Sequence, residues 1–308
     1  MSAIIIYMLA IVAPGQGAQT SGFLASWCHL ESFRTGLAQL SQNCGLDLVE
    51  LGTKADNETI KDTAIAQPLL VASALLVYRE LNVRPDLVAG HSVGEIAAAS
   101  MSGVLSELEA MTFVAARGRA MAKAAALTPT GMSAVLAGKP DEIATRLADL
   151  NLVAANNNGR GQVVAAGKLD DLAELAANPP ARARVIPLRV AGAFHTDYMA
   201  SAREDLIPLA KTLKPANPTV TLLSNLDGQA VASGSQYLDN LINQVTRCVR
   251  WDLCMKQMNE LGVTGLLELA PAKTLTGIAK RNMSAEVFNL NTPDQLDAAH
   301  DFCARHAA

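Results

Sequence analysis

Short apolar runs alternate with longer stretches of helical periodicity along most of this 308-residue chain. The short runs end at glycine, proline, serine or asparagine, which is typical of buried strands, and the segments between them are long enough for helices. The expected strands of this kind cover residues 8–13, 86–90, 219–224 and 265–270. This alternation predicts a parallel sheet covered by helices.

The longest helical pattern covers residues 58–81 and contains Pro68. A proline inside a helix removes one backbone hydrogen bond and clashes with the preceding turn. We therefore expect this helix to be kinked or divided in two at Pro68.

The pattern changes between residues 131 and 189, where the predicted order is β-α-β-β-α-β. A series of about 60 residues in this order forms a ferredoxin-like unit that folds as a small domain. The fold class expected is therefore α/β, with a large parallel-sheet domain of α/β-hydrolase-like type and an inserted ferredoxin-like subdomain. The expected division assigns 1–129 and 190–308 to the large domain and 130–189 to the insert.

The sequence GHSVGE, residues 90–95, follows the expected strand 86–90 and precedes an alanine-rich helical pattern. A serine on a tight strand-to-helix turn needs flanking glycines because a Cβ there would collide with the turning backbone. The context predicts that Ser92 is a nucleophile. The alternative is a serine that caps a helix whose glycines allow close packing.

A serine hydroxyl attacks only when a base removes its proton, and His195 is the best placed of five histidines. It follows a predicted strand and opens a helix, directly after the small domain; a helix-capping or partly buried histidine is the alternative. The PGQG turn after the first strand offers backbone donors for an oxyanion. We expect the amides of Gln16 and Val93 to form this pair of donors.

Arg117 lies on a helical pattern with apolar residues on the neighbouring turns, whereas Arg119 does not. An arginine in an apolar site usually binds a carboxylate, because burial of an unpaired charge is costly. Arg117 is thus a candidate for holding a substrate carboxylate. The alternative is that either arginine extends to solvent.

Composition excludes several classes of function. A net charge of −4 and 4% aromatic residues make nucleic acid an improbable partner. The five cysteines are scattered, with no spacing that suits zinc, so we expect no metal and a reduced, cytoplasmic compartment. The apolar start, residues 3–13, lacks a basic segment before it and is too short to span a bilayer, which favours a buried strand and no membrane association.

Five motifs occur in the order found in malonyl-CoA:acyl carrier protein transacylases: GQGAQ, AQPLL, GHSVGE, RGRAM and AFH. The chain resembles this family from about residue 8 to residue 289. The resemblance implies transfer of malonyl from coenzyme A to the phosphopantetheine thiol of acyl carrier protein, through an ester on Ser92 with His195 as base and acid. Both thioesters are substrates, so no cofactor is implied, and we expect a monomer.

The resemblance also implies further roles. The main-chain carbonyl of Gln244 would support His195 in place of a carboxylate. Phe194 and Gln67 would line the acyl pocket, and Phe194 together with Val93 is similar to the malonyl-selective pattern rather than the methylmalonyl one. One methyl group is worth about 1 to 3 kcal/mol in a pocket, so a preference is expected rather than an absolute bar.

Three alternatives remain open at this point. The carrier protein served could belong to polyketide rather than fatty acid synthesis, since the segment VAGAFH is similar to the polyketide type. The chain could be a serine esterase or thioesterase of α/β-hydrolase type, which releases acyl groups to water. It could also be an inert docking module of a larger synthase, although Ser92, His195 and Arg117 are all present.

Overall fold

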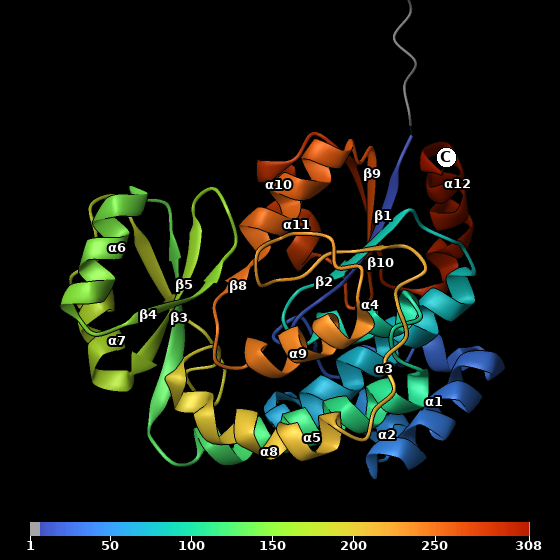
Figure 1. Ribbon diagram of the computed structural model, residues 1–308, viewed down its shortest axis with the longest axis horizontal. Coiled ribbons are helices and arrows are strands. Elements are labelled where there is room, and N and C mark those ends of the chain that lie inside the picture. Colours follow the sequence, from blue (N-terminus) through green and yellow to red (C-terminus); the bar gives the residue numbers. More distant parts are fainter. Residues whose placement is uncertain (1–6, 308) are drawn as a thin grey trace, which may run out of the picture.

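The computed structural model describes residues 7–307 and contains two lobes, each built around a five-stranded sheet (Figure 1). The sheet of the large lobe has the order β10-β9-β1-β2-β7, and all its strand pairs are parallel. Its strands are β1 Leu9–Ala13, β2 Leu87–Gly90, β7 Thr221–Leu222, β9 Gly265–Leu269 and β10 Glu286–Leu290. Residues 3–6 of the predicted first strand lie outside the described residues.

Alternate residues of β1 contribute to two hydrophobic clusters, as the two-residue period of a strand requires. Leu9, Ile11 and Ala13 belong to the cluster formed with most of the helices, whereas Ala10 and Val12 pack with residues of α10 and α11. The helices of this lobe are α1 Glu31–Cys44, α2 Leu48–Thr53, α3 Thr63–Leu81, α4 Gly94–Met101, α5 Glu107–Ala125, α8 Ala200–Ala210, α9 Gly234–Gln244, α10 Trp251–Leu261, α11 Thr274–Asn282 and α12 Leu296–His306.

The small lobe contains the six elements expected between residues 131 and 189 (Figure 1, green). They are β3 Thr130–Leu136, α6 Pro140–Asp149, β4 Val153–Asn157, β5 Gln162–Lys168, α7 Leu169–Ala177 and β6 Arg184–Pro187. The strand order β6-β3-β5-β4 is the antiparallel arrangement of a ferredoxin-like unit. The α/β fold with this second sheet confirms the predicted fold class, and the division at residues 130 and 189 stays a proposal.

Two features differ from the sequence-based expectation. Helix α3 runs without interruption from Thr63 to Leu81 through Pro68, and only a short 3-10 helix, Thr59–Lys61, precedes it. The single lost hydrogen bond is tolerated because α3 is buried against α1, α4 and α5. In addition, β8 Val249–Arg250 extends the small sheet beside β4, although it lies in the large domain's part of the chain.

Helix α3 is also long and apolar enough to cross a membrane by length and composition, but 72% of that stretch is buried inside the fold. Buried core helices of folded domains commonly have this length and composition. All five cysteines are free thiols in the structure.

Candidate active site

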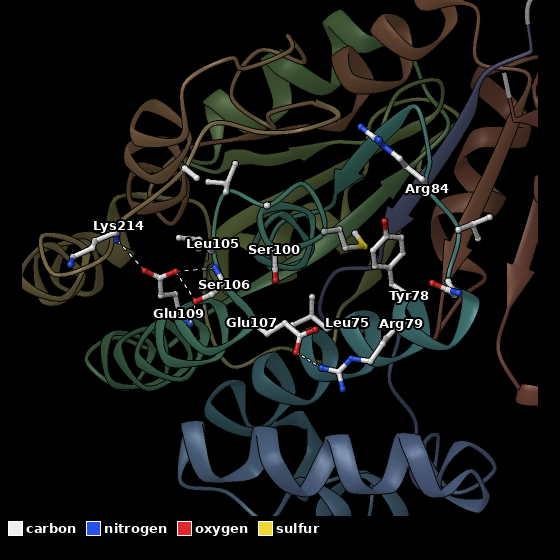
Figure 2. A pocket seen from close by; sticks show the side chains of 16 residues that line it. Leu75, Tyr78, Arg79, Arg84, Ser100, Leu105, Ser106, Glu107, Glu109 and Lys214 are labelled. Carbon is white, nitrogen blue, oxygen red and sulfur yellow. Dashed lines mark hydrogen bonds and ion pairs between the residues drawn. The ribbon is translucent and has the colours of Figure 1, made fainter.

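Two cavities differ sharply in their chemistry. The larger, of about 840 Å³, lies where the end of α3 meets the segment between α4 and α5, and Figure 2 shows its lining side chains. Arg79 pairs with Glu107 there, and Glu109 accepts from the backbone amides of Ser106 and Lys214. No histidine is among its lining residues. We therefore place the candidate active site in the second cavity.

The second cavity, of about 580 Å³, lies between the two lobes. Its wall combines the turn after β1, the turn after β2 and residues of the small sheet such as Met132 and Asn156. Ser92 and His195 both line it. The carboxyl ends of β1 and β2 meet at this edge of the parallel sheet, which is where α/β folds place their ligands.

The turn that carries Ser92 depends on glycine at two positions. A Cβ on Gly90 would lie 2.0 Å from the carbonyl group of Gly94, and one on Gly94 would lie 2.4 Å from the oxygen of Ala13. Ser92 itself has a φ of 54°, a left-handed conformation that is strained for a residue with a side chain. The turn between β2 and α4 therefore has the backbone geometry of a nucleophile elbow.

His195 lies directly beside the serine hydroxyl. Its Nε2 is 2.7 Å from Ser92 Oγ, and its Nδ1 is 2.8 Å from the main-chain oxygen of Gln244. A carbonyl oxygen can only accept, so Nδ1 carries the proton and Nε2 accepts from the serine. Gln244 ends α9, and the geometry that the resemblance implied for its carbonyl is present.

The electrostatics keep this imidazole neutral. Burial, and then the nearby charge of Arg117, lower the pKa of His195 to about 3, while the bond to the Gln244 carbonyl acts in the opposite direction. A histidine with such a pKa is unprotonated at neutral pH. It is therefore available to take a proton from Ser92.

The two amides predicted as oxyanion donors have no other partner. Within residues 7–307, neither the Gln16 nor the Val93 N–H donates to a protein acceptor. Gly15 brings the turn after β1 against the elbow, because a Cβ there would lie 2.8 Å from the His91 ring. Both amides thus belong to the two turns that meet at Ser92.

Arg117 is buried and Arg119 is exposed, so Arg117 remains the candidate of the two. The guanidinium donates to Oε1 of Gln67 and to Oε1 of Gln244, each at 2.7 Å. Burial lowers the pKa of Arg117 to about 10, so it remains charged at neutral pH. Gln67 lines the cavity, whereas Arg117 lies behind it. Two of the five N–H groups of Arg117 are thus engaged, and a carboxylate would compete with these amide oxygens for the guanidinium.

Phe194 and Gln67 both line the cavity that contains Ser92. Asn156 lines it as well, and its Oδ1 is buried without a hydrogen-bond partner among the described residues. A buried carbonyl oxygen of this kind is costly unless a ligand donor or water satisfies it.

Sequence reasoning missed two residues that hold the elbow. The Oδ1 of Asn225 accepts from the Ser92 amide, and its Nδ2 donates to the Gly90 carbonyl, both at 2.8 Å. Glu95 accepts from the amide of Asn225 at 2.7 Å. Glu95 belongs to the motif itself and could have been singled out there, whereas no local pattern marks Asn225.

The histidine next to the serine has a different place from His195. His91 Nε2 is 2.9 Å from Oδ1 of Asn158, a residue just beyond β4. Burial lowers the pKa of His91 as well, so it stays neutral. Its ring therefore joins the elbow to the small lobe rather than to Ser92 Oγ.

Comparisons with known proteins agree with this geometry. A family model described as the acyl transferase domain matches residues 11–302. The fold and the site therefore define an acyl transferase. A malonyl CoA-acyl carrier protein transacylase of Mycobacterium tuberculosis is 50% identical over 282 residues, which cover 90% of this chain and 93% of that relative. The chain belongs to the malonyl CoA-acyl carrier protein transacylase family.

Solved structures are similar over the same length. The crystal structure of MCAT from Mycobacterium tuberculosis has a TM-score of 0.92 and 48% identity, covering 96% of this chain and 100% of that one. A malonyl-transacylase in complex with a type II PKS acyl-carrier protein has a TM-score of 0.89 and 28% identity, covering 96% and 99%.

Proposed function

We propose that this chain transfers malonyl from malonyl-CoA to the phosphopantetheine thiol of an acyl carrier protein through an ester on Ser92. The contact between Ser92 Oγ and His195 Nε2, at 2.7 Å on the wall of a cavity, carries the proposal. The names of the related proteins supply the substrate class.

In the first half-reaction, Ser92 Oγ attacks the thioester carbonyl as its proton passes to His195 Nε2. The oxyanion that forms accepts from the amides of Gln16 and Val93. When the tetrahedral intermediate collapses, the bond between carbon and sulfur breaks, and the coenzyme A thiolate takes the proton from His195. In the second half-reaction, the carrier thiol gives its proton to His195, attacks the ester, and Ser92 recovers the proton.

The main-chain support of His195 suits this cycle. A carbonyl stabilises an imidazolium less than a carboxylate does, and the exchange joins two thioesters of similar energy. When a malonyl carboxylate pairs with Arg117, it cancels part of the charge that depresses the pKa of His195. Substrate binding thus strengthens the base at the moment it is needed.

Selectivity for malonyl follows from Arg117, behind the cavity, and Phe194, on its wall. Arg117 would hold the free carboxylate with its planar fork, in competition with the amide oxygens of Gln67 and Gln244. Phe194 fills space near Ser92 that an α-methyl group would need.

We further propose that the carrier belongs to fatty acid synthesis and that the enzyme is cytoplasmic, monomeric and free of cofactors. Five free thiols support a reducing compartment. The structural similarity to a transacylase that binds a type II PKS carrier leaves polyketide synthesis as the second candidate pathway. Transfer rates to purified carriers of both kinds would decide between them.

The experiment is to incubate the protein with malonyl-CoA and to locate the malonyl mass by peptide mass spectrometry. Wild type should gain it on Ser92, and Ser92→Ala should gain none. Adding holo-carrier should then move the label to the carrier faster than free malonate is released. Label on another residue would contradict the mechanism, and hydrolysis faster than transfer would indicate an esterase.

A further inference from the structure

Glu95 occupies a buried position directly behind the elbow and has no role in the mechanism above. It lies one helical turn after Ser92 in α4 and is 1% exposed. Its Oε1 accepts from the Asn225 amide and, at 3.3 Å, from the Tyr237 hydroxyl. Its Oε2 accepts from Nε2 of Gln244. A carboxylate removed from water in this way is costly unless its partners serve a purpose.

The side chain of Gln244 lies between this carboxylate and a cation. Its Nε2 donates to Glu95 and to the main-chain oxygen of Ser92, while its Oε1 accepts from Arg117. The reversed amide would place NH₂ against the guanidinium and oxygen against the carboxylate. The two opposite charges therefore permit only one orientation of the Gln244 amide.

Gln244 contacts two groups of the proposed active site, one through its main chain and one through its side chain. Its main-chain oxygen holds the Nδ1 proton of His195, and its side-chain oxygen holds Arg117. A group that fixes the Gln244 side chain therefore acts on Arg117, whereas the main-chain oxygen that holds His195 is placed by the end of α9.

We propose that Glu95 is a positioning residue whose carboxylate, acting through the Gln244 amide, holds Arg117 in the orientation that receives the malonyl carboxylate. This inference rests on the proposed malonyl transfer. Glu95 touches no reacting atom, so its contribution is to selectivity for a charged acyl group. Acetyl, which has no carboxylate to pair with Arg117, should depend on Glu95 far less.

The titration of Glu95 can be distinguished from that of the charged and titratable groups around it, because their pKa values differ. Arg117 faces it from α5, Tyr237 from α9 and Cys254 from α10. The pKa of Arg117 is about 10, burial keeps the pKa values of Tyr237 and Cys254 well above their ordinary ones, and that of His195 is about 3. Burial raises the pKa of Glu95 to about 7. Of these groups, Glu95 alone changes charge near neutral pH.

The pKa of Glu95 gives the direction in which the malonyl-to-acetyl ratio should change with pH. Above pH 7 the carboxylate is ionised and accepts from Gln244 Nε2; below pH 7 it binds a proton and loses acceptor strength. The ratio of malonyl to acetyl labelling of Ser92, as kcat/KM, should therefore fall as the pH drops from 8.5 to 6. The ratio cancels effects on Ser92 and His195, which both substrates use.

The experiment compares wild type, Glu95→Gln and Tyr237→Phe over this pH range. Glutamine at 95 has one amide oxygen for the two donors that Glu95 accepts from, the Asn225 amide and Gln244 Nε2. The Asn225 N–H is fixed in the backbone, so we expect the oxygen to face Asn225 and the NH₂ group to face Gln244 Nε2. We expect the malonyl-to-acetyl ratio of Glu95→Gln at pH 8 to fall at least tenfold, mainly through a higher KM for malonyl-CoA, and to lose its pH dependence. Tyr237→Phe removes a hydroxyl that contacts Glu95 Oε1 and the main-chain oxygens of Glu95 and Leu223, but it leaves the bond between Oε2 and Gln244 in place. It should keep the wild-type ratio at pH 8.5, and the fall of the ratio should begin at a higher pH, because the hydroxyl lowers the pKa of Glu95.

Each other outcome overturns the inference. A ratio in Glu95→Gln equal to that of wild type, with both substrates losing activity in step with the melting temperature, would make Glu95 structural. A wild-type ratio that rises on acidification would make Glu95 a competitor of the substrate for Arg117. If Glu95→Gln does not fold, the wild-type pH profile decides alone. A malonyl-to-acetyl ratio that falls on acidification supports the inference, and a flat ratio refutes it. Absence of malonyl on wild-type Ser92 would instead refute the proposed function.

Discussion

Replacement of Arg117 by alanine is the sharpest test of the acyl specificity. Arg117 is 1% exposed, so solvent does not screen its interaction with a substrate carboxylate. Removing one partner of a buried ion pair costs about 3–5 kcal/mol. Part of this is offset because the carboxylate competes with two amide oxygens that already accept from the guanidinium, each at 2.7 Å.

A net loss of about 2–4 kcal/mol corresponds to a roughly 30- to 1000-fold decrease in kcat/KM for malonyl-CoA. For acetyl-CoA we expect a change below about threefold, since only the malonyl group pairs with the guanidinium. Arg117→Lys is the matched control: it keeps the charge without the bidentate fork and should lie between wild type and Arg117→Ala.

The assay is stopped-flow or quenched labelling of Ser92 with each coenzyme A thioester, on protein whose fold is checked by circular dichroism and thermal melting. Equal losses for malonyl and acetyl in a folded Arg117→Ala variant would refute the assigned role. Such a result would mean that Arg117 supports the site as a whole, through Gln67 and Gln244, rather than one substrate.

Two further predictions concern the base and the elbow. In Arg117→Ala, the acid limb of the pH–rate profile for acetyl labelling should move to higher pH, because the charge of Arg117 is the second cause, after burial, that lowers the pKa of His195; an unmoved limb would show that burial alone acts. Gly94→Ala should lose more than about 3 kcal/mol of unfolding free energy, because its Cβ would lie 2.4 Å from the Ala13 oxygen. The matched control, Gly277→Ala in α11, meets nothing within 4 Å and should gain about 0.5–1 kcal/mol; equal melting temperatures of the two variants would contradict the packing argument.

Local pattern was sufficient for the architecture and for singling out Ser92 and His195, which the structure brings within 2.7 Å of each other. The alternation of apolar runs and helical stretches predicts the parallel sheet, and the order of elements between residues 131 and 189 predicts the ferredoxin-like strands. The elbow at Ser92 was predictable because a tight turn, its glycines and its flanking elements all lie within about ten residues. His195 was predictable because few histidines compete with it.

Where a pattern was overruled, packing is the reason. Pro68 lacks one helical hydrogen bond, yet α3 continues through it because neighbouring helices bury almost every residue of that turn. The strand pairing of β8 with β4 joins chain segments about ninety residues apart, and nothing in the two-residue strand itself indicates its partner.

Only the tertiary structure decided how the site is held together. Ser92, Asn225 and Gln244 are more than a hundred residues apart from first to last, and their hydrogen bonds exist because the ends of β2, β7 and α9 converge. The same convergence buries Arg117 rather than Arg119 and sets the Gln244 amide between Glu95 and Arg117. Sequence patterns report the period of one element and the chemistry of one turn, whereas a hydrogen bond between distant segments depends on how whole elements pack.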